Sequence, residues 1–120
     1  MSEGFAAFAA HQFELSAPQK DGSTLREHLA AYEEKTGVPH PSLAAAPELP
    51  RACVHLWRDF LDLHGCRGSS MAGPARITYS DIDAFQRVTG TRFEPWELGA
   101  IRKADHAYLD SIAKRTKRDG

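Results

Sequence analysis

The chain has 120 residues, of which 42% are hydrophobic and 26% are charged, and its formal net charge is −1. This length and composition predict one small globular domain, and the near-zero charge gives no general attraction to nucleic acid or to an anionic membrane surface. No apolar stretch is long enough to cross a bilayer, and two cysteines without a signal-peptide pattern predict a cytoplasmic protein with free thiols.

The first 23 residues are predicted to form an N-terminal arm. Phe5, Phe8 and Phe13 recur at roughly helical spacing, but a helix this short is not stable alone in water. Pro18–Gly22 is rich in helix breakers and reads as a linker. We therefore expect a short amphipathic helix or a mobile arm, and we expect Met1–Gln19 to be poorly packed on its own subunit, or packed on a neighbour, with the three phenylalanines available for a partner.

Residues 24–50 are predicted to contain one helix and an irregular connector. Thr24 and Glu27 form a capping-box pattern, and the helix that they start should end before Gly37. Four prolines then follow, at positions 39, 41, 47 and 50. A regular helix cannot run through them, so we expect at most one turn, at Ser42–Ala46.

Arg51–His64 is the clearest helix of the sequence. Its apolar residues follow the i, i+3, i+4 spacing of a buried helix face, as at Leu56, Trp57 and Phe60. Val54 lies on the flank of this face and is a further candidate for partner binding. We expect the helix to end at Gly65, and the glycine-rich segment Gly65–Ala75 to be a flexible surface loop.

A pair of helices is predicted within Arg76–Arg115. Thr78 and Asp81 form a capping box for the first helix, Gly90 ends it, and Pro95 fits the first turn of the second. The basic residues that follow suit the negative end of the helix dipole and read as a solvated helix end with a tail at 116–120: Lys114, Arg115, Lys117 and Arg118.

Together these elements predict an all-α fold of about four to five helices, with the C-terminal helical hairpin packed on the Trp57 helix. Residues 51–115 should form the core domain. The expected core residues are Leu56, Trp57, Phe60, Ile82, Phe85, Ile101 and Tyr108.

Asp105 is the exception among the apolar positions of the last helix. At 100° per residue it falls on the same face as Leu98, Ile101 and Tyr108. A carboxylate there is costly unless it is paired, so we predict a buried polar clamp that accepts hydrogen bonds. The candidate donors are the open N-terminus of a neighbouring helix, the indole of Trp57 or Trp96, or an arginine such as Arg76 or Arg58.

No residue set in the sequence predicts a catalytic, cofactor-binding or metal site. Cys53 and His55 diverge by about 200° around a helix, which is wrong for zinc. The glycine-rich loop lacks the lysine of a phosphate-binding loop, and no Gly-x-Ser-x-Gly elbow is present. The helix pair around Gly90 has a helix-turn-helix outline, but its second helix opens with acidic and apolar residues instead of base-reading ones.

Three stretches carry a resemblance to a known family: TLREHLAAYEEKTG, PELPRACVHLWRDFLDLHGCRGSS and ITYSDIDAFQRVTGTRFEPWELGAIRKADHAYL. They resemble the tail assembly chaperones of long-tailed phages and prophages, over roughly Thr24–Ala113. The strongest matching groups are Leu56-Trp57 with Phe60, Ile82-Asp83, Pro95-Trp96-Glu97, and Asp105 with Tyr108-Leu109. These are packing residues, and residues 1–23 lie outside the match.

The resemblance implies a non-enzymatic protein without cofactors. Such a protein binds the tape-measure protein in the host cytoplasm and keeps that long helical rod soluble while tail-tube subunits assemble around it. The tail-tube protein is a second candidate partner, and a homo-oligomer is compatible with a chaperone that coats a long rod, although the sequence does not specify the oligomeric state. The alternative is a small phage DNA-binding or packaging accessory protein that uses the helix-turn-helix-like pair.

Overall fold

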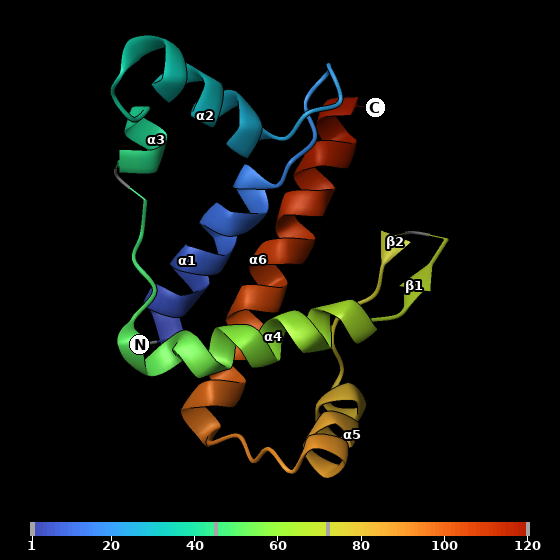
Figure 1. Ribbon diagram of the computed structural model, residues 1–120. Helices are drawn as coiled ribbons and strands as arrows, with labels where there is room; N and C mark the ends of the chain where they lie inside the picture. The colour runs from blue at the N-terminus through green and yellow to red at the C-terminus, as the bar shows by residue number, and fades with distance from the viewer. Residues whose placement is uncertain (1, 45, 72, 120) are drawn as a thin grey trace.

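The computed structural model describes the backbone of residues 2–44, 46–71 and 73–119, and the side chains of residues 2–43, 46–71 and 73–115. The prediction of an all-α fold is confirmed, and the described chain holds six α-helices, one of them a single turn (Figure 1). In chain order the elements are α1 (Ser2–Leu15), α2 (Leu25–Thr36), α3 (Pro41–Ala44), the 3₁₀ turn η1 (Arg51–Cys53), α4 (Val54–Cys66), the two-residue strands β1 (Ser69–Ser70) and β2 (Gly73–Pro74), α5 (Tyr79–Thr89) and α6 (Pro95–Asp119).

The predicted start and stop signals are those that the structure uses. The Thr24 hydroxyl accepts a hydrogen bond from the Glu27 backbone at the start of α2. Thr78 and Asp81 form a reciprocal capping box at the start of α5, which satisfies two backbone donors that would otherwise lack partners. Gly90 ends α5 with a φ of 75°, a left-handed conformation that costs glycine little.

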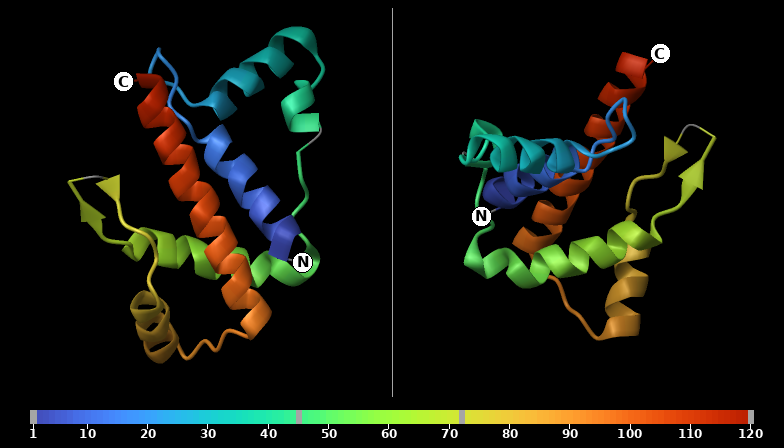
Figure 2. Two further views of the ribbon diagram at one scale, coloured as in Figure 1. Left: turned by 180° about the vertical axis from the view of Figure 1, so that it is seen from behind. Right: turned by 45° about the horizontal axis from the view of Figure 1, so that its top comes forward.

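α1 packs against α6, and the two helices run in the same direction side by side (Figures 1 and 2). Lys103 Nζ of α6 lies 3.2 Å from Ser2 Oγ, and Arg115 Nη2 donates to the Phe13 carbonyl at 3.0 Å. Phe5 and Phe13 are buried. The prediction of a poorly packed arm is therefore wrong: the face of α1 that carries these rings is covered by its own subunit.

α4 crosses α6, which passes behind it in the view of Figure 1, and the buried residues of α4 belong to the core. The expected core residues lie where they were predicted: Leu56, Phe60, Ile82 and Ile101 are buried, and Trp57, Phe85 and Tyr108 are partly buried against them. α1 adds residues that the prediction left out of the core, namely Phe5, Ala9 and Phe13. The hydrophobic core is thus shared by both ends of the chain.

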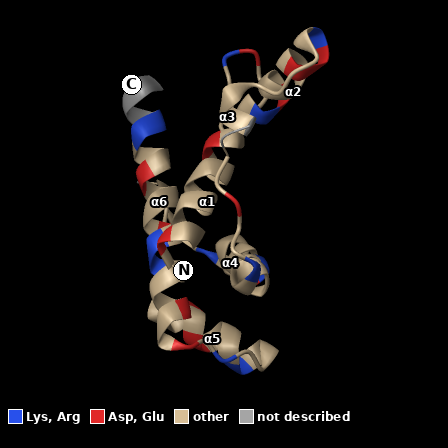
Figure 3. Ribbon diagram, turned by 90° about the vertical axis from the view of Figure 1, so that its left-hand side faces the viewer, with Lys and Arg blue, Asp and Glu red and all other residues tan. Residues whose placement is uncertain are grey.

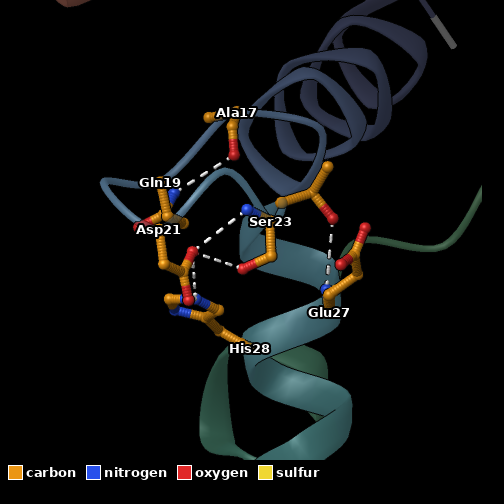
Figure 4. Close-up of polar contacts among 7 residues, drawn as sticks. Ala17, Gln19, Asp21, Ser23, Glu27 and His28 are labelled. Atoms are coloured by element: carbon orange, nitrogen blue, oxygen red, sulfur yellow. Dashed lines mark hydrogen bonds and ion pairs between the residues drawn. The ribbon is translucent and has the colours of Figure 1, made fainter.

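The linker between α1 and α2 is held by a local polar network (Figure 4). The Asp21 carboxylate accepts hydrogen bonds from the Ser23 hydroxyl at 2.6 Å and from the Ser23 backbone at 3.0 Å. These bonds, with a contact to His28, lower the pKa of Asp21 to about 2. The breaker-rich linker is therefore a defined turn.

Several boundaries differ from the prediction. The helix predicted from Arg51 opens with the 3₁₀ turn η1 and is α-helical only from Val54, and α6 continues to Asp119, through most of the segment predicted to be a tail. α4 continues one residue beyond Gly65, to Cys66, because glycine there keeps a helical conformation. The segment after it, predicted to be a flexible loop, forms a small antiparallel ribbon in which Ser69 pairs with Pro74. The proline-rich connector contains the expected single turn as α3.

Candidate functional site

The residues predicted to bind a partner fall into two groups in the structure. Phe5 and Phe13 are buried in the core of their own subunit, so they are not available at the surface of this fold. Phe8 is half-buried, with its ring edge-on to Trp57 at 5.0 Å. Val54 is 48% exposed on α4. Partner binding by Phe8 and Val54 stays a prediction.

A groove of about 400 Å³ lies between α1, α4 and α6. Four ring side chains, from Phe13, Trp57, His64 and Tyr108, contribute to its lining, together with Leu61 and Arg115. Leu61 is 44% exposed. The groove thus offers an apolar, largely aromatic lining with an exposed leucine, the kind of surface that accepts an apolar side chain or a helix face.

The rings of the groove support one another from three helices. The Phe13 and Tyr108 ring centroids are 5.0 Å apart, and His64 meets Tyr108 edge-on at 4.4 Å. Trp57 stacks on the buried Phe60 at 5.7 Å. Contacts of this geometry add to the stability gained by burial. The side chains that line the groove are therefore held in place by the packing of the fold.

Asp105 lies behind the groove and is buried. Its Oδ2 accepts a hydrogen bond from the Ile77 backbone at 3.0 Å, which immediately precedes the capping residue of α5. Its Oδ1 lies 2.7 Å from Arg67 Nη2, in an ion pair without hydrogen-bond geometry to the described residues. The predicted kinds of donor are found, a backbone amide just ahead of a neighbouring helix and an arginine, but the arginine is Arg67. Arg58 and Arg76 are exposed, and the Trp96 indole donates to Glu94.

Arg67 is the residue that sequence reasoning missed here. It lies in the segment predicted to be a flexible loop, yet its side chain is only 6% exposed. Its guanidinium stands 4.5 Å from the centre of the Tyr108 ring and donates to the Ala75 carbonyl at 2.9 Å. A buried carboxylate requires a counter-charge, so Asp105 itself was the signal for such a partner.

His64 is held as a neutral acceptor between the groove and the ion pair. Its Nδ1 accepts from Arg67 Nε at 3.1 Å and from Nη2 at 2.8 Å. Burial lowers the pKa of His64 below 6.5, the positive charge of Arg67 lowers it further, and Asp105 opposes them. Because a protonated Nδ1 could not accept these bonds, the geometry favours the same state.

A second polar contact joins α4 to the start of α6. Glu97 is 6% exposed, and its carboxylate lies 2.7 Å from His55 Nε2 while accepting from the Glu94 backbone at 2.9 Å. The first turn of α6 is therefore turned toward α4. A base-reading helix needs this turn free to enter the major groove, so the observation weighs against the helix-turn-helix interpretation.

Figure 3 shows basic and acidic segments interspersed over the helices. Among the described residues, no helix is long and apolar enough to span a membrane.

The comparisons with known proteins gave one match. A family described as phage tail assembly chaperone matches residues 32–110, more than half of the chain, including all of α4 and α5 and most of α6. No curated protein and no solved structure matches the chain. The match agrees with the resemblance seen in the sequence, and the chain belongs to the phage tail assembly chaperone family.

Proposed function

We propose that this chain binds the tape-measure protein during tail assembly and keeps its apolar helical segments from aggregating, in the cytoplasm of the host cell. The role is one of binding, without catalysis. The observation that carries it is the family match over residues 32–110. The tape-measure protein is the tail component that most needs such a partner, because a long amphipathic rod exposes apolar surface until the tube encloses it.

The groove between α1, α4 and α6 supports this proposal. Chaperones that hold helices present an apolar groove to the apolar face of the helix. Trp57, Leu61 and Tyr108 supply such a surface here. Aromatic and leucine side chains can contact many different apolar sequences, which suits a client whose apolar positions vary along its length.

The test is co-expression of this chain with the tape-measure protein of the same phage or prophage. The soluble fraction of the tape-measure protein after centrifugation is expected to rise several-fold over expression alone, and the two proteins should co-purify. An unrelated aggregating protein expressed in the same way serves as the control. A tape-measure protein that stays in the pellet, although this chain is folded and soluble, would contradict the proposal.

A further inference from the structure

We infer that the groove binds one amphipathic helix of the client that carries aliphatic residues over about two turns and carboxylates on its flanks. This inference rests on the proposed function, since it specifies the segment that the client presents. It follows from the position of the exposed apolar side chains, from the surface that the fold leaves uncovered, and from the charges around the groove.

The exposed apolar side chains of α4 form one stripe that leads out of the groove: Leu61 lines the groove, and Val54 lies beyond its lining. Val54, Trp57 and Leu61 are spaced at i, i+3 and i+7, so they line one edge of α4 over about 10 Å. Val54 and Leu61 are 48% and 44% exposed. The Phe8 ring of α1 meets the Trp57 ring edge-on at 5.0 Å. A helix laid along this stripe meets it with its own i, i+3 or i+4, and i+7 positions.

Other exposed apolar side chains do not form such a stripe. Met71 lies between β1 and β2, Tyr32 is on α2 and Val38 follows it, and Tyr79 and Val88 are at opposite ends of α5. Apolar side chains exposed singly are ordinary on a soluble protein. The groove between α1, α4 and α6 differs from these sites because a cavity, an aromatic lining and an exposed leucine occur together there.

The fold exposes more surface than a compact monomer of its mass. The accessible area is 8112 Å², whereas a compact chain of 13.3 kDa exposes about 6,500 Å². The Cα radius of gyration, 15.9 Å, likewise exceeds the value of about 14 Å expected for this length. The difference in area is enough for a standard interface, which covers about 800 Å² on each partner.

The charges beside the groove are positive. Arg115 lines it, Arg58 lies next to both Val54 and Leu61 on α4, and Arg26 bonds to the lining residue Gln12 at 2.8 Å. Two carboxylates of the same elements lie farther round: Glu14 is about 160° around α1 from Gln12, and Asp62, one turn after Arg58, is about 100° around α4 from Leu61. An acidic flank on the bound helix therefore complements the rim.

The experiment measures binding of a fluorescent helical peptide, with leucine at i, i+3 and i+7 and glutamate on both flanks, to the full chain by anisotropy. A peptide with lysine in place of the glutamates is the matched probe. The glutamate peptide is expected to bind about tenfold more tightly, with the difference shrinking as salt is raised. Equal binding of the two peptides would overturn the acidic-flank assignment.

The variants Leu61→Glu and Val54→Glu place a carboxylate in the stripe, and each should weaken binding of the glutamate peptide by about tenfold. Val88→Glu is the matched control, since Val88 is 85% exposed on α5, and it should change the affinity by less than about twofold. Thermal melting verifies that all three variants fold. If one of the two stripe variants fails to fold, the other still tests the inference. Stripe variants that bind like Val88→Glu would overturn the inference.

The co-expression assay separates this inference from the proposed function. If the wild-type chain solubilises the tape-measure protein and Leu61→Glu and Val54→Glu do so equally well, the groove assignment fails while the proposed function stands. If the wild-type chain binds the peptide and leaves the tape-measure protein in the pellet, the proposed function fails while the groove remains a site for acidic-flanked helices.

Discussion

Arg67 Nη2 lies 2.7 Å from Asp105 Oδ1, and both side chains are less than a tenth exposed. Arg67 follows α4 directly, Asp105 lies within α6, and its other oxygen binds the backbone of Ile77 ahead of α5. One ion pair therefore fixes how three segments meet. At this junction the segments are joined by charge and a backbone hydrogen bond, where elsewhere apolar side chains join them.

Removing one member of this pair should be strongly destabilising. Asp105→Leu is expected to lower the free energy of unfolding by about 3–5 kcal/mol, because Arg67 is left buried without a counter-charge. Asp105→Asn should cost less, since its amide oxygen can still accept from Ile77. Urea unfolding measures both, and an Asp105→Leu variant as stable as the wild type would contradict the clamp.

The double variant Arg67→Met, Asp105→Leu provides the control for this interpretation. Replacing both charges with apolar groups removes the uncompensated charge, so its loss of stability should be smaller than the sum of the two single losses. Simple additivity would mean that the two residues stabilise the fold independently.

Stability should fall as the pH is lowered through the titration range of an ordinary histidine. The pKa of His64 is lowered in the folded state by burial and then by Arg67, while the unfolded chain titrates near 6.5. The unfolded state therefore takes up the proton first, and stability is lost as the pH falls from about 6.5 to the folded pKa, and changes no further below it.

The measurement is the urea midpoint between about pH 5 and 8, for the wild type and for His64→Gln. The variant should lack this part of the pH dependence. Burial raises the pKa of Asp59, which acts in the opposite direction, so the difference between the two proteins is the quantity to compare. Parallel midpoint curves for the two proteins would show that His64 does not titrate differently on unfolding.

The packing of α1 predicts that its aromatic residues contribute as much as those of α4. Phe5 and Phe60 are both 0% exposed, so Phe5→Ala and Phe60→Ala should each cost about 3–5 kcal/mol in urea unfolding. Val88→Ala, at an 85% exposed site, should stay within about 0.5 kcal/mol. A Phe5→Ala variant that behaves like Val88→Ala would mean that α1 is a loosely attached arm.

Two glycines should respond oppositely to alanine. Gly99 lies inside α6 with nothing within 4 Å of an added Cβ, so Gly99→Ala should stabilise the protein by about 0.5–1 kcal/mol. Gly90 has equal space but a φ of 75°, so Gly90→Ala should destabilise it by about 1–2 kcal/mol. The measurement is the melting temperature of each variant, which should rise for Gly99→Ala and fall for Gly90→Ala. Two shifts of the same sign would refute the conformational explanation.

Local signals in the sequence were sufficient for the helices of this fold. Thr24, Thr78 and Gly90 each act through backbone groups within a few residues, so their patterns predict helix ends without knowledge of the tertiary structure. The apolar phase of α4 likewise predicted Leu56 and Phe60 as core. Such features depend on the residue and its near neighbours alone.

Features that depend on distant parts of the chain could not be predicted in this way. Nothing in residues 2–15 indicates that their apolar face meets α6, nearly a hundred residues later. Arg67 lies among glycines and serines, a context typical of solvated loops, and only Asp105 in three dimensions accounts for its burial. Leu61 also fits the apolar pattern of α4. The buried face of α4 is narrower than the face that this pattern marks, so Leu61 stays exposed and lines the groove.

The two ends of the β1–β2 ribbon are held together at its base. Arg67 donates to the Ala75 carbonyl, and the Ala75 amide donates to the Gly68 carbonyl at 2.9 Å. Met71, at the far end of the ribbon, is fully exposed. Lengthening a loop whose ends are already held costs only about 0.6 kcal/mol for each doubling of its length. A short epitope inserted after Ser70 should therefore leave the ion pair intact, which makes this ribbon a place to attach a label without disturbing the fold.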